Sequence, residues 1–432
     1  MEMRQMMIYL WITSCFLLNA CKGDFEEETY PPEETTITEY TLKEDLEVRW
    51  VKRFNKDQYA LQTLVLNDKV VFAMSHPTDL SSFVVHLLAL DKSTGDTVWV
   101  WEEGLLLMKD VICYDDKLYF YSSSDGLPTC VDANTGKKLW QWDDGQYREI
   151  NGLVPINGRI YTSAGYGHRG VQGFRETRVI SLDPNTGTPE IEFIFNTDQR
   201  DGHSLSLYEP MPWKHPNGDL IIFYNASAVG SGINWYPRYI AANITADSIY
   251  FDLGNYFEAV AKGGVSIYGD KVYFGSSPTR TQTWKTGCIN MLTKEVEWVN
   301  ELTKTDPSAV KPIKMGNRIL MNPGNTHYTN CLNASTGELE WTNTKCGKRT
   351  SDFLPHNGIG WIKSGEGIIG LDPMSGEIVH HVRNYELHEE LWKQKSEGWT
   401  VAEFSSFSID QQTGWFYSAS FGEYFTCFRF KK

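Results

Sequence analysis

Short runs of β-forming residues, each bounded by turn residues, follow one another along most of the chain. The stretch VDANTGKKLW, from Val131 to Trp140, shows the pattern in full. Valine, leucine and tryptophan favour strands, and the Asp-x-x-Thr-Gly segment between them is typical of a tight turn. Glycine supplies the positive φ that such a turn needs, while aspartate and threonine side chains hydrogen-bond its backbone. The stretch therefore predicts two antiparallel strands joined by a tight turn.

This predicted hairpin recurs along the chain. Equivalent segments begin at five other aspartate or asparagine residues, three of them followed eight residues later by tryptophan: Asp91, Asp183, Asn290, Asn333 and Asp372. Neighbouring copies lie about forty to sixty residues apart over most of the chain, which is typical of a repeat architecture. The copy at Asn290 has Lys294 in place of the glycine.

One repeat can be divided into four strands. In the second repeat we expect strands over Asp110–Cys113, Lys117–Ser122, Pro128–Asp132 and Lys138–Trp142. Asp115-Asp116 would turn the first strand into the second, and similar pairs recur at Asn67-Asp68, Asn157-Gly158, Asn217-Gly218, Gly269-Asp270, Gly316-Asn317 and Asn357-Gly358. Asn, Asp and Gly tolerate the left-handed conformations of hairpin turns. Each repeat is therefore predicted to be a four-stranded meander.

The number of repeats follows from one position on the third strand, two residues before the aspartate or asparagine. A small residue occupies it eight times: Ala89, Cys130, Ser181, Ala241, Cys288, Cys331, Gly370 and Cys427. A position restricted to small side chains indicates close packing by an adjacent sheet. This gives eight repeats and accounts for four of the eight cysteines as small hydrophobic residues.

The two ends of the repeat region complement each other. The last repeat ends at about Phe430 without a fourth strand, while Leu46–Val51 has the pattern of a fourth strand with no first three before it. Pairing these ends would close a ring and leave no open sheet edge. The predicted fold is therefore an all-β, eight-bladed β-propeller of four-stranded antiparallel blades over residues 46–432, closed by the N-terminal strand. A seven-bladed propeller is the alternative.

Charge narrows the classes of partner. The 432 residues carry a formal net charge of −15, with a pI near 5.2. An acidic surface repels both a phosphate backbone and an anionic membrane surface. We therefore expect no nucleic-acid partner.

The N-terminus has the pattern of a targeting segment. Arg4 precedes an apolar run from Met6 to Leu18 that is too short to span a bilayer. Leu18-Asn19-Ala20-Cys21 resembles the lipobox of bacterial lipoproteins, which implies a signal peptide over residues 1–20 and lipidation of Cys21. A cleaved secretory peptide with an incidental cysteine is the alternative. Membrane attachment would then need the lipid anchor only.

An acidic segment follows the predicted anchor. Residues 22–28 (KGDFEEE) resemble the motif that sends lipoproteins of Bacteroidetes-type bacteria to the outer face of the outer membrane. The resemblance implies a cell-surface location, with a solvated tether or a periplasm-facing protein as alternatives. Either way, residues 21–45, which include Pro31-Pro32, are predicted to form an extended linker.

The repeated Leu-Asp-x-x-Thr-Gly-x-x-x-Trp hairpin, over roughly Leu46 to Phe430, resembles the repeat of the quinoprotein (PQQ-like) propeller family. The enzyme branch of that family would imply PQQ and calcium at the propeller axis and oxidation of alcohols or sugars. That branch commonly has two adjacent cysteines, which this chain lacks. A non-enzymatic branch includes the lipoprotein of the outer-membrane β-barrel assembly machinery, which is similar in size, lipid anchor and blade count. The resemblance therefore favours a propeller with no cofactor, no metal and no catalytic site.

Candidate binding residues lie in the long connections. Propeller topology puts the short turns at one end of the ring and the longer second-to-third and fourth-to-first connections at the other, where function gathers on loops held by a scaffold. Aromatic and arginine side chains, which are enriched at recognition surfaces, occur there at Tyr166, His168, Arg169, Phe174, Trp235, Tyr236, Arg238, Arg280, Trp284, His327 and Tyr328. The alternative is that these side chains only pack the loops together or plug the channel.

No catalytic motif of the common hydrolase or metallopeptidase types is present. We therefore expect a non-catalytic binding or scaffold propeller for envelope or outer-membrane protein partners. A surface lipoprotein that binds carbohydrate or peptide, with Trp235, Tyr236 and Trp284 as stacking platforms, is the alternative. A PQQ-dependent oxidoreductase is a further alternative.

Overall fold

The structure is a computed structural model in which the described residues begin at Asp45 and end at Lys431. Within that span it does not describe residues 78–82, 106–107, 123–126, 144–146, 167–175, 197–203, 230–234, 254–263, 277–283, 303–310, 323–327, 348–350, 366, 388–403 and 421. The predicted signal peptide, the lipidation site at Cys21 and nearly all of the predicted linker lie outside the described residues.

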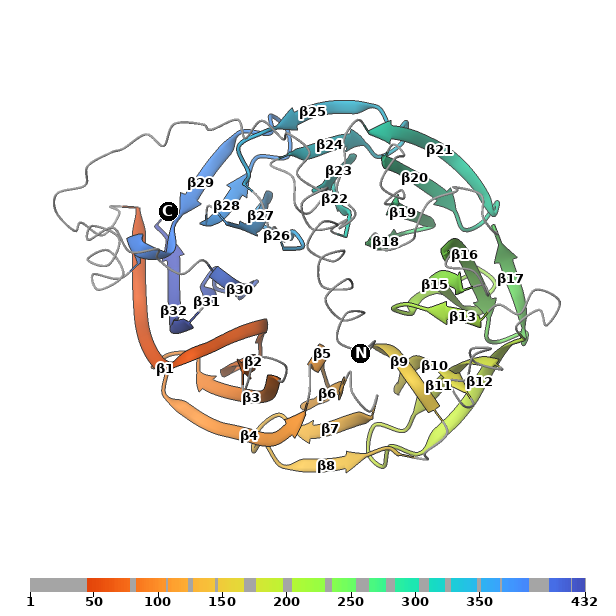
Figure 1. The fold of residues 1–432 in the computed structure, drawn as a ribbon. Helices are drawn as coiled ribbons and strands as arrows, with labels where there is room; N and C mark the ends of the chain where they lie inside the picture. The colour runs from red at the N-terminus through yellow and green to blue at the C-terminus, as the bar shows by residue number, and fades with distance from the viewer. Residues whose placement is uncertain are drawn as a thin grey trace, which may run out of the picture. The chain divides into compact units, whose positions relative to one another are not determined.

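The described part of the chain is a ring of eight antiparallel sheets, or blades (Figure 1). Blade 1 consists of the second half of β1 (Leu46–Val65), β2 (Lys69–Pro77), β3 (Phe83–Asp91) and β4 (Thr97–Leu105). Blade 2 has β5 (Met108–Tyr114), β6 (Lys117–Ser122), β7 (Pro128–Asp132) and β8 (Lys138–Gln141). Blade 3 has β9 (Tyr147–Ile156), β10 (Arg159–Tyr166), β11 (Glu176–Leu182) and β12 (Pro189–Asn196).

Blades 4 to 6 complete the far side of the ring. Blade 4 has β13 (Ser204–Leu207) and β14 (Met211–Lys214), both paired with β15 (Leu220–Val229), then β16 (Trp235–Asn243) and β17 (Ser248–Asp252). Blade 5 has β18 (Val265–Tyr268), β19 (Lys271–Ser276), β20 (Trp284–Asn290) and β21 (Glu295–Leu302). Blade 6 has β22 (Ile313–Met315), β23 (Arg318–Met321), β24 (Thr329–Asn333) and β25 (Leu339–Asn343).

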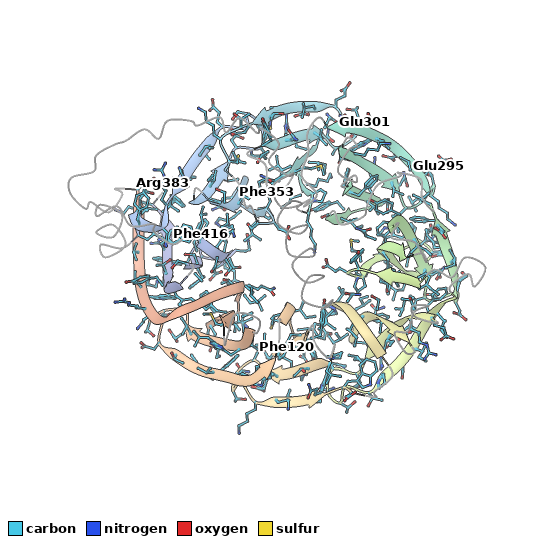
Figure 2. The ribbon with its side chains drawn as sticks, in the orientation of Figure 1. Phe120, Glu295, Glu301, Phe353, Arg383 and Phe416 are labelled. Atoms are coloured by element: carbon cyan, nitrogen blue, oxygen red, sulfur yellow. The ribbon has the colours of Figure 1, made fainter. Side chains whose placement is uncertain are left out.

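The last two blades bring the chain back to its start. Blade 7 has β26 (Leu354–His356), β27 (Ile359–Ser364), β28 (Gly367–Leu371) and β29 (Ile378–Val382). Blade 8 has β30 (Phe404–Ile409), β31 (Phe416–Ser420), β32 (Gly422–Phe430) and the first half of β1. A 3-10 turn at Asn384–Glu386 is the one helical element among the described residues. In each blade the first strand is innermost and the fourth lies on the outer rim, where Glu295 and Glu301 of β21 project (Figure 2).

Strand β1 closes the ring, as the sequence predicts. Its first half pairs with β32, with Trp50 opposite Cys427. Its second half pairs with β2, with Tyr59 opposite Ser75. The fourth strand of the last blade and the first strand of the first blade are therefore one continuous strand. Eight blades are confirmed, and the seven-bladed alternative is wrong.

The predicted strands of the second repeat match closely. Strands β6 and β7 have the predicted bounds, β5 extends beyond both ends of Asp110–Cys113, and β8 ends one residue before Trp142. The turn residues between β5 and β6 adopt the left-handed conformation, with φ of 51° at Asp115 and 53° at Asp116. This conformation suits the right-handed twist of the flanking strands.

The Asp-x-x-Thr-Gly turns hold their own shape. The Asp132 carboxylate accepts hydrogen bonds from the Asn134 and Thr135 N–H groups at 3.0 and 2.7 Å, and from the Thr135 hydroxyl at 2.8 Å. The Gly136 N–H donates to the Asp132 carbonyl at 2.9 Å. In the third repeat, hydrogen bonds from Asn185 and Thr186 lower the pKa of the Asp183 carboxyl. The turn is therefore a compact unit with few polar groups left to satisfy.

Five of these six turns receive a tryptophan from the preceding blade. The indole N–H donates to the carbonyl of the residue after the aspartate or asparagine, at 3.0 to 3.2 Å, in five pairs: Trp50 to Lys92, Trp99 to Ala133, Trp140 to Pro184, Trp298 to Ala334 and Trp341 to Pro373. At the turn that begins at Asn290, the Tyr250 hydroxyl takes the place of the indole and donates to the Met291 carbonyl at 2.9 Å. We call this contact the docking bond. It joins neighbouring blades by a buried or half-buried ring and a directional bond.

The turn glycine is required by the ring that covers it. Gly187 has φ of 71°, and a Cβ added there would lie 2.6 Å from Cε3 of Trp140. Both the backbone conformation and the closeness of the indole exclude other residues. The turn at Asn290 has Lys294 in place of the glycine, with φ of 63°. Here the covering ring is Tyr250 rather than a tryptophan, and the Lys294 ammonium lies 4.1 Å from its centre.

The small third-strand residues lie between two large ones of the same blade. Cys130 is fully buried, with Tyr119 of β6 opposite it on one side and Trp140 of β8 on the other. Where the residue is Gly370, a Cβ would lie 2.9 Å from Cζ3 of Trp361. The position is therefore restricted first by its own blade, and only then by the adjacent sheet that the sequence predicts.

Apolar side chains fill the space between successive blades. Phe120, for example, packs edge-on against Trp101 of blade 1, with ring centres 5.0 Å apart (Figure 2). At the closure, Phe72 and Phe425 meet with centres 4.4 Å apart. Burial of these rings supplies the main driving force for blade association.

We predict that Gly187→Ala destabilises the fold more than Gly158→Ala. Both glycines have positive φ, 71° and 81°, but nothing lies within 4 Å of a Cβ at Gly158. The Gly158 variant should therefore show only the backbone cost, roughly 1–2 kcal/mol. The Gly187 variant should lose about 2 kcal/mol more, because the methyl group meets Trp140. Urea unfolding of the two variants measures the difference, and equal losses would show that the docked ring does not constrain the turn.

Candidate binding surfaces

The two ends of the ring differ in their connections. At one end lie the turns between first and second strands and between third and fourth strands, including every docked turn. At the other end lie the second-to-third and fourth-to-first connections, which we call the long-loop end. Its longest connections join blades 4 to 8, over residues 253–264, 303–312, 344–353 and 383–403. Loops of this length on a rigid frame are typical of binding surfaces.

The backbone of six predicted site residues is described, and all six lie at the long-loop end. Tyr166 ends β10, Trp235 begins β16 and Trp284 begins β20, while Tyr236 and Arg238 follow in β16 and Tyr328 directly precedes β24. These strands belong to blades 3 to 6, which are consecutive in the ring. The structure therefore brings the predicted residues to one end of neighbouring blades. The side chain described among them, Tyr328, is 40% exposed.

The other predicted site residues cannot be placed. His168, Arg169, Phe174, Arg280 and His327 lie outside the described residues. Their proposed role in binding therefore stays a prediction.

Ion pairs and hydrogen bonds fix the strand ends from which these loops leave. In blade 3 the Arg178 guanidinium pairs with Glu176 at 2.6 Å, next to Tyr166. In blade 6 the buried Asn322 amide donates to the Thr329 hydroxyl at 3.1 Å. Such contacts hold the roots of the loops in fixed positions, which lowers the entropy lost when a partner binds.

A charged cluster lies on the inner wall near the same end. Lys311, before β22, forms an ion pair with Glu209, before β14, and its N–H donates to the Asp352 carboxylate, before β26, at 3.1 Å. The backbone of Gly264 is so close that a Cβ there would lie 2.4 Å from the Lys311 Cα. Residues from blades 4 and 6 can meet across blade 5 only near the axis, where the blades converge. The cluster therefore lies on the inner side of the ring.

The sequence holds a signal for this cluster. Glu209 and Lys311, each followed by a proline, lie two residues before an inner strand, and Asp352 lies at the same distance before another. Proline keeps the preceding residue extended. A charged residue two positions before an inner strand therefore lies on the inner side of the ring.

The cluster does not suit calcium. Lysine is not a ligand for that ion, which takes oxygen donors, and here the Lys311 ammonium pairs with Glu209 while the Lys311 backbone N–H binds Asp352. No group of three histidine, cysteine or carboxylate residues in the described part of the chain could hold a metal ion. These residues therefore do not fit the calcium of the enzyme branch.

Asp352 titrates abnormally. Its side chain is reached by water, yet enough protein surrounds it that desolvation raises the pKa of the carboxyl, and the Lys311 N–H offsets this only in part. A raised pKa means that the folded state favours the protonated acid. Relative to the unfolded chain, the protonated Asp352 adds to the stability of the fold below about pH 3.9, the pKa of the unfolded state. This contribution is lost as the pH rises through the pKa of Asp352 in the folded state.

We predict that Asp352→Asn stabilises the protein at pH 7. The amide keeps an oxygen for the Lys311 N–H but carries no charge to desolvate, so the melting temperature should rise relative to wild type. The gain should shrink as the pH falls through the raised pKa of wild-type Asp352, where the carboxyl takes up its proton. Thermal unfolding at several pH values measures it. A variant less stable than wild type at pH 7 would mean that attraction to Lys311 outweighs desolvation.

Comparisons with known proteins agree on the fold. No family model matches the chain. A segment of 59 residues is 39% identical to a quinoprotein alcohol dehydrogenase of Pseudomonas putida, which covers 14% of this chain and 9% of that protein. The chain thus matches less than a tenth of the length of that relative.

Solved structures match over nearly the whole chain. BamB from Moraxella catarrhalis is 15% identical, with a TM-score of 0.55, over 89% of this chain and 98% of that one. A europium-containing methanol dehydrogenase is 10% identical, with a TM-score of 0.59, over 89% and 93%. The Dos1 propeller is 11% identical, with a TM-score of 0.61, over 89% and 97%. At these identities the likeness concerns the fold, and the chain has the fold of a PQQ-like β-propeller.

Proposed function

We propose that the protein is a non-catalytic, lipid-anchored envelope protein whose long-loop end binds protein partners. One observation carries the proposal: the short turns at one end are docked against neighbouring blades, while every long connection lies at the other end. Long connections can vary in sequence without disturbing the docked turns, which suits a surface that binds a partner. The acidic surface directs it away from nucleic acid.

The aromatic residues at the long-loop end suit contact with a protein partner. Trp235, Tyr236 and Trp284 begin strands at this end, and Tyr328 exposes 40% of its surface there. Aromatic side chains of this kind supply most of the binding free energy at protein interfaces. The structural likeness to BamB adds to the proposal, while the likeness to a methanol dehydrogenase keeps an enzyme as the alternative.

The membrane attachment forms part of the same proposal. Cys21 would carry the lipid, and residues 21–45 would tether the propeller to the outer membrane, at the cell surface or facing the periplasm. Within the described residues, no helix is long and apolar enough to cross a membrane. Metabolic labelling with a fatty-acid analogue should mark the wild type and not Cys21→Ser.

We predict that Trp235→Ala/Trp284→Ala lowers partner capture at least tenfold, since each lost anchor costs about 2 kcal/mol or more at an interface. The measurement is affinity capture of the lipidated protein from its native membrane, followed by mass spectrometry. Val98→Ala/Leu139→Ala is the matched control, because both side chains are exposed on outer strands, at 44% and 46%.

The outcome separates the functional classes. A partner lost only from the tryptophan variant supports the proposal, provided that both variants unfold at the wild-type urea concentration. Equal capture by wild type and tryptophan variant would contradict it. No partner in any sample would instead favour the carbohydrate- or peptide-binding alternative, which a glycan array then tests.

A further inference from the structure

Blade 7 presents an exposed methionine in its docked turn. Met374 is the second residue after Asp372 in the turn between β28 and β29, and its N–H donates to the Asp372 carboxylate at 2.8 Å. Its side chain is 63% exposed, more than any other large apolar side chain that the structure describes. The equivalent residues of the other docked turns contain no sulfur: Ser93, Asn134, Asn185, Leu292 and Ser335. Blade 7 alone therefore presents a thioether at this position of a docked turn.

This thioether contacts a guanidinium of the preceding blade. Arg318 begins β23 of blade 6, and its Nη1 donates to Met374 Sδ at 2.9 Å. The same guanidinium pairs through Nε with Glu340 of β25 at 2.6 Å, which holds it from its own blade. The contact thus crosses the junction of blades 6 and 7, which the docking bond from Trp341 to Pro373 O also joins. A thioether sulfur is only a weak acceptor, so the strong donor of Arg318 gains little from it.

Peroxides convert a methionine thioether to the sulfoxide. The sulfur lone pair attacks one oxygen of hydrogen peroxide, so that an S–O bond forms while the O–O bond breaks. The departing hydroxide takes the proton from the oxygen now on sulfur and leaves as water. Sulfur is oxidised by two electrons and peroxide is reduced by two. The product carries a polar oxygen, which accepts hydrogen bonds far better than the sulfur did.

The other methionines of the propeller are shielded from such a reagent. Those whose side chains the structure describes are buried or half-buried: Met74, Met211, Met291, Met315 and Met321. Met74 and Met291 expose none of their surface. Since the oxidant must reach the sulfur, Met374 is the methionine among them that reacts first.

The cysteines are poor competitors for the oxidant. The thiolate is the reactive form of cysteine. Burial raises the pKa of the thiol to about 12 at Cys130, Cys288, Cys331 and Cys427, and to about 11 at Cys346. Desolvation and the nearby Asp116 carboxylate raise the pKa of Cys113 as well. Few of these thiols are ionised at neutral pH, so Met374 is the sulfur of the described residues that is most open to peroxide.

We propose that Met374 is a reversible oxidation site, whose sulfoxide is bound by the Arg318 guanidinium and strengthens the junction of blades 6 and 7. The sulfoxide oxygen puts a strong acceptor beside a charged donor that is already in place, and such hydrogen bonds are stronger than those between neutral groups. Oxidation of a buried methionine disrupts the core around it, whereas Met374 lies on the surface.

Reduction returns the site to its first state. Methionine sulfoxide reductases remove the oxygen as water, and two thiols become a disulfide in the same reaction. The modification is independent of the long-loop end, because the docked turns lie at the other end of the ring.

Peptide mapping by mass spectrometry tests the selectivity. The full-length protein is treated with dilute hydrogen peroxide, and the sulfoxide at each methionine is followed with time. We expect the sulfoxide to form at Met374 at least about tenfold faster than at Met74 or Met291, because solvent does not reach the latter two. Oxidation of all three at one rate would overturn the proposal.

Urea unfolding of the same samples tests the role of Arg318. We expect a higher midpoint after oxidation of wild type, which returns to its first value on treatment with both methionine sulfoxide reductases and a thiol. Met374→Leu, treated with peroxide in the same way, should show no change. Arg318→Leu should oxidise at Met374 but show no gain, since it offers no donor. Each variant is compared with its own untreated sample, so the lost pair with Glu340 does not enter the comparison.

A variant that carries an acceptor oxygen from the start avoids peroxide altogether. Glutamine is similar to methionine sulfoxide in length and polarity, so Met374→Gln should have a higher urea midpoint than Met374→Leu when Arg318 is present. The difference should vanish in the Arg318→Leu background. A lower or unchanged midpoint in oxidised wild type, an equal gain in oxidised Arg318→Leu, or equal midpoints of Met374→Gln and Met374→Leu would each contradict the proposal.

Discussion

The docking bond between a tryptophan and the next blade's turn is the interaction on which the ring depends. A single four-stranded blade has two apolar faces and cannot bury either alone, so its stability comes from its neighbours. Contacts between apolar side chains of adjacent blades bury most of the area, and at the five junctions that have it the indole bond fixes how far one blade is rotated relative to the next. Trp140 shows both roles, since it covers Gly187 within van der Waals contact and donates to Pro184 O at 3.0 Å.

This interaction also separates the two ends of the molecule. A turn that is held by its own aspartate and covered by an indole cannot change length or sequence without loss of packing. The opposite end carries no such contact in the described residues, and its connections differ widely in length, from residues 106–107 to residues 383–403. The docked turns at one end hold the blades in place, so the loops at the other end can vary. A repeat scaffold acquires a binding surface in this way.

The fold could be predicted from the sequence because its signals are local and repeated. The Asp-x-x-Thr-Gly turn, the small third-strand residue and the unpaired strand pattern at Leu46–Val51 each specify a backbone conformation or a close contact. For the binding site, the sequence predicts only at which end of the ring it lies. The order of the strands puts Tyr166, Trp235 and Trp284 at that end but does not say what their side chains contact. The pairing of Lys311 with Glu209 depends on the curvature of the ring, which brings together residues a hundred positions apart.

Site-specific photo-crosslinking in living cells tests most directly whether the long-loop end is the surface that partners use. A photoreactive phenylalanine at Tyr328 or Trp284 reports on that end, and the same residue at Asn134 or Asn185, which are exposed in docked turns of blades 2 and 3, reports on the other. The account predicts adducts to a discrete envelope protein from Tyr328 and Trp284 and none from Asn134 and Asn185. Adducts from the two asparagine positions alone would contradict it.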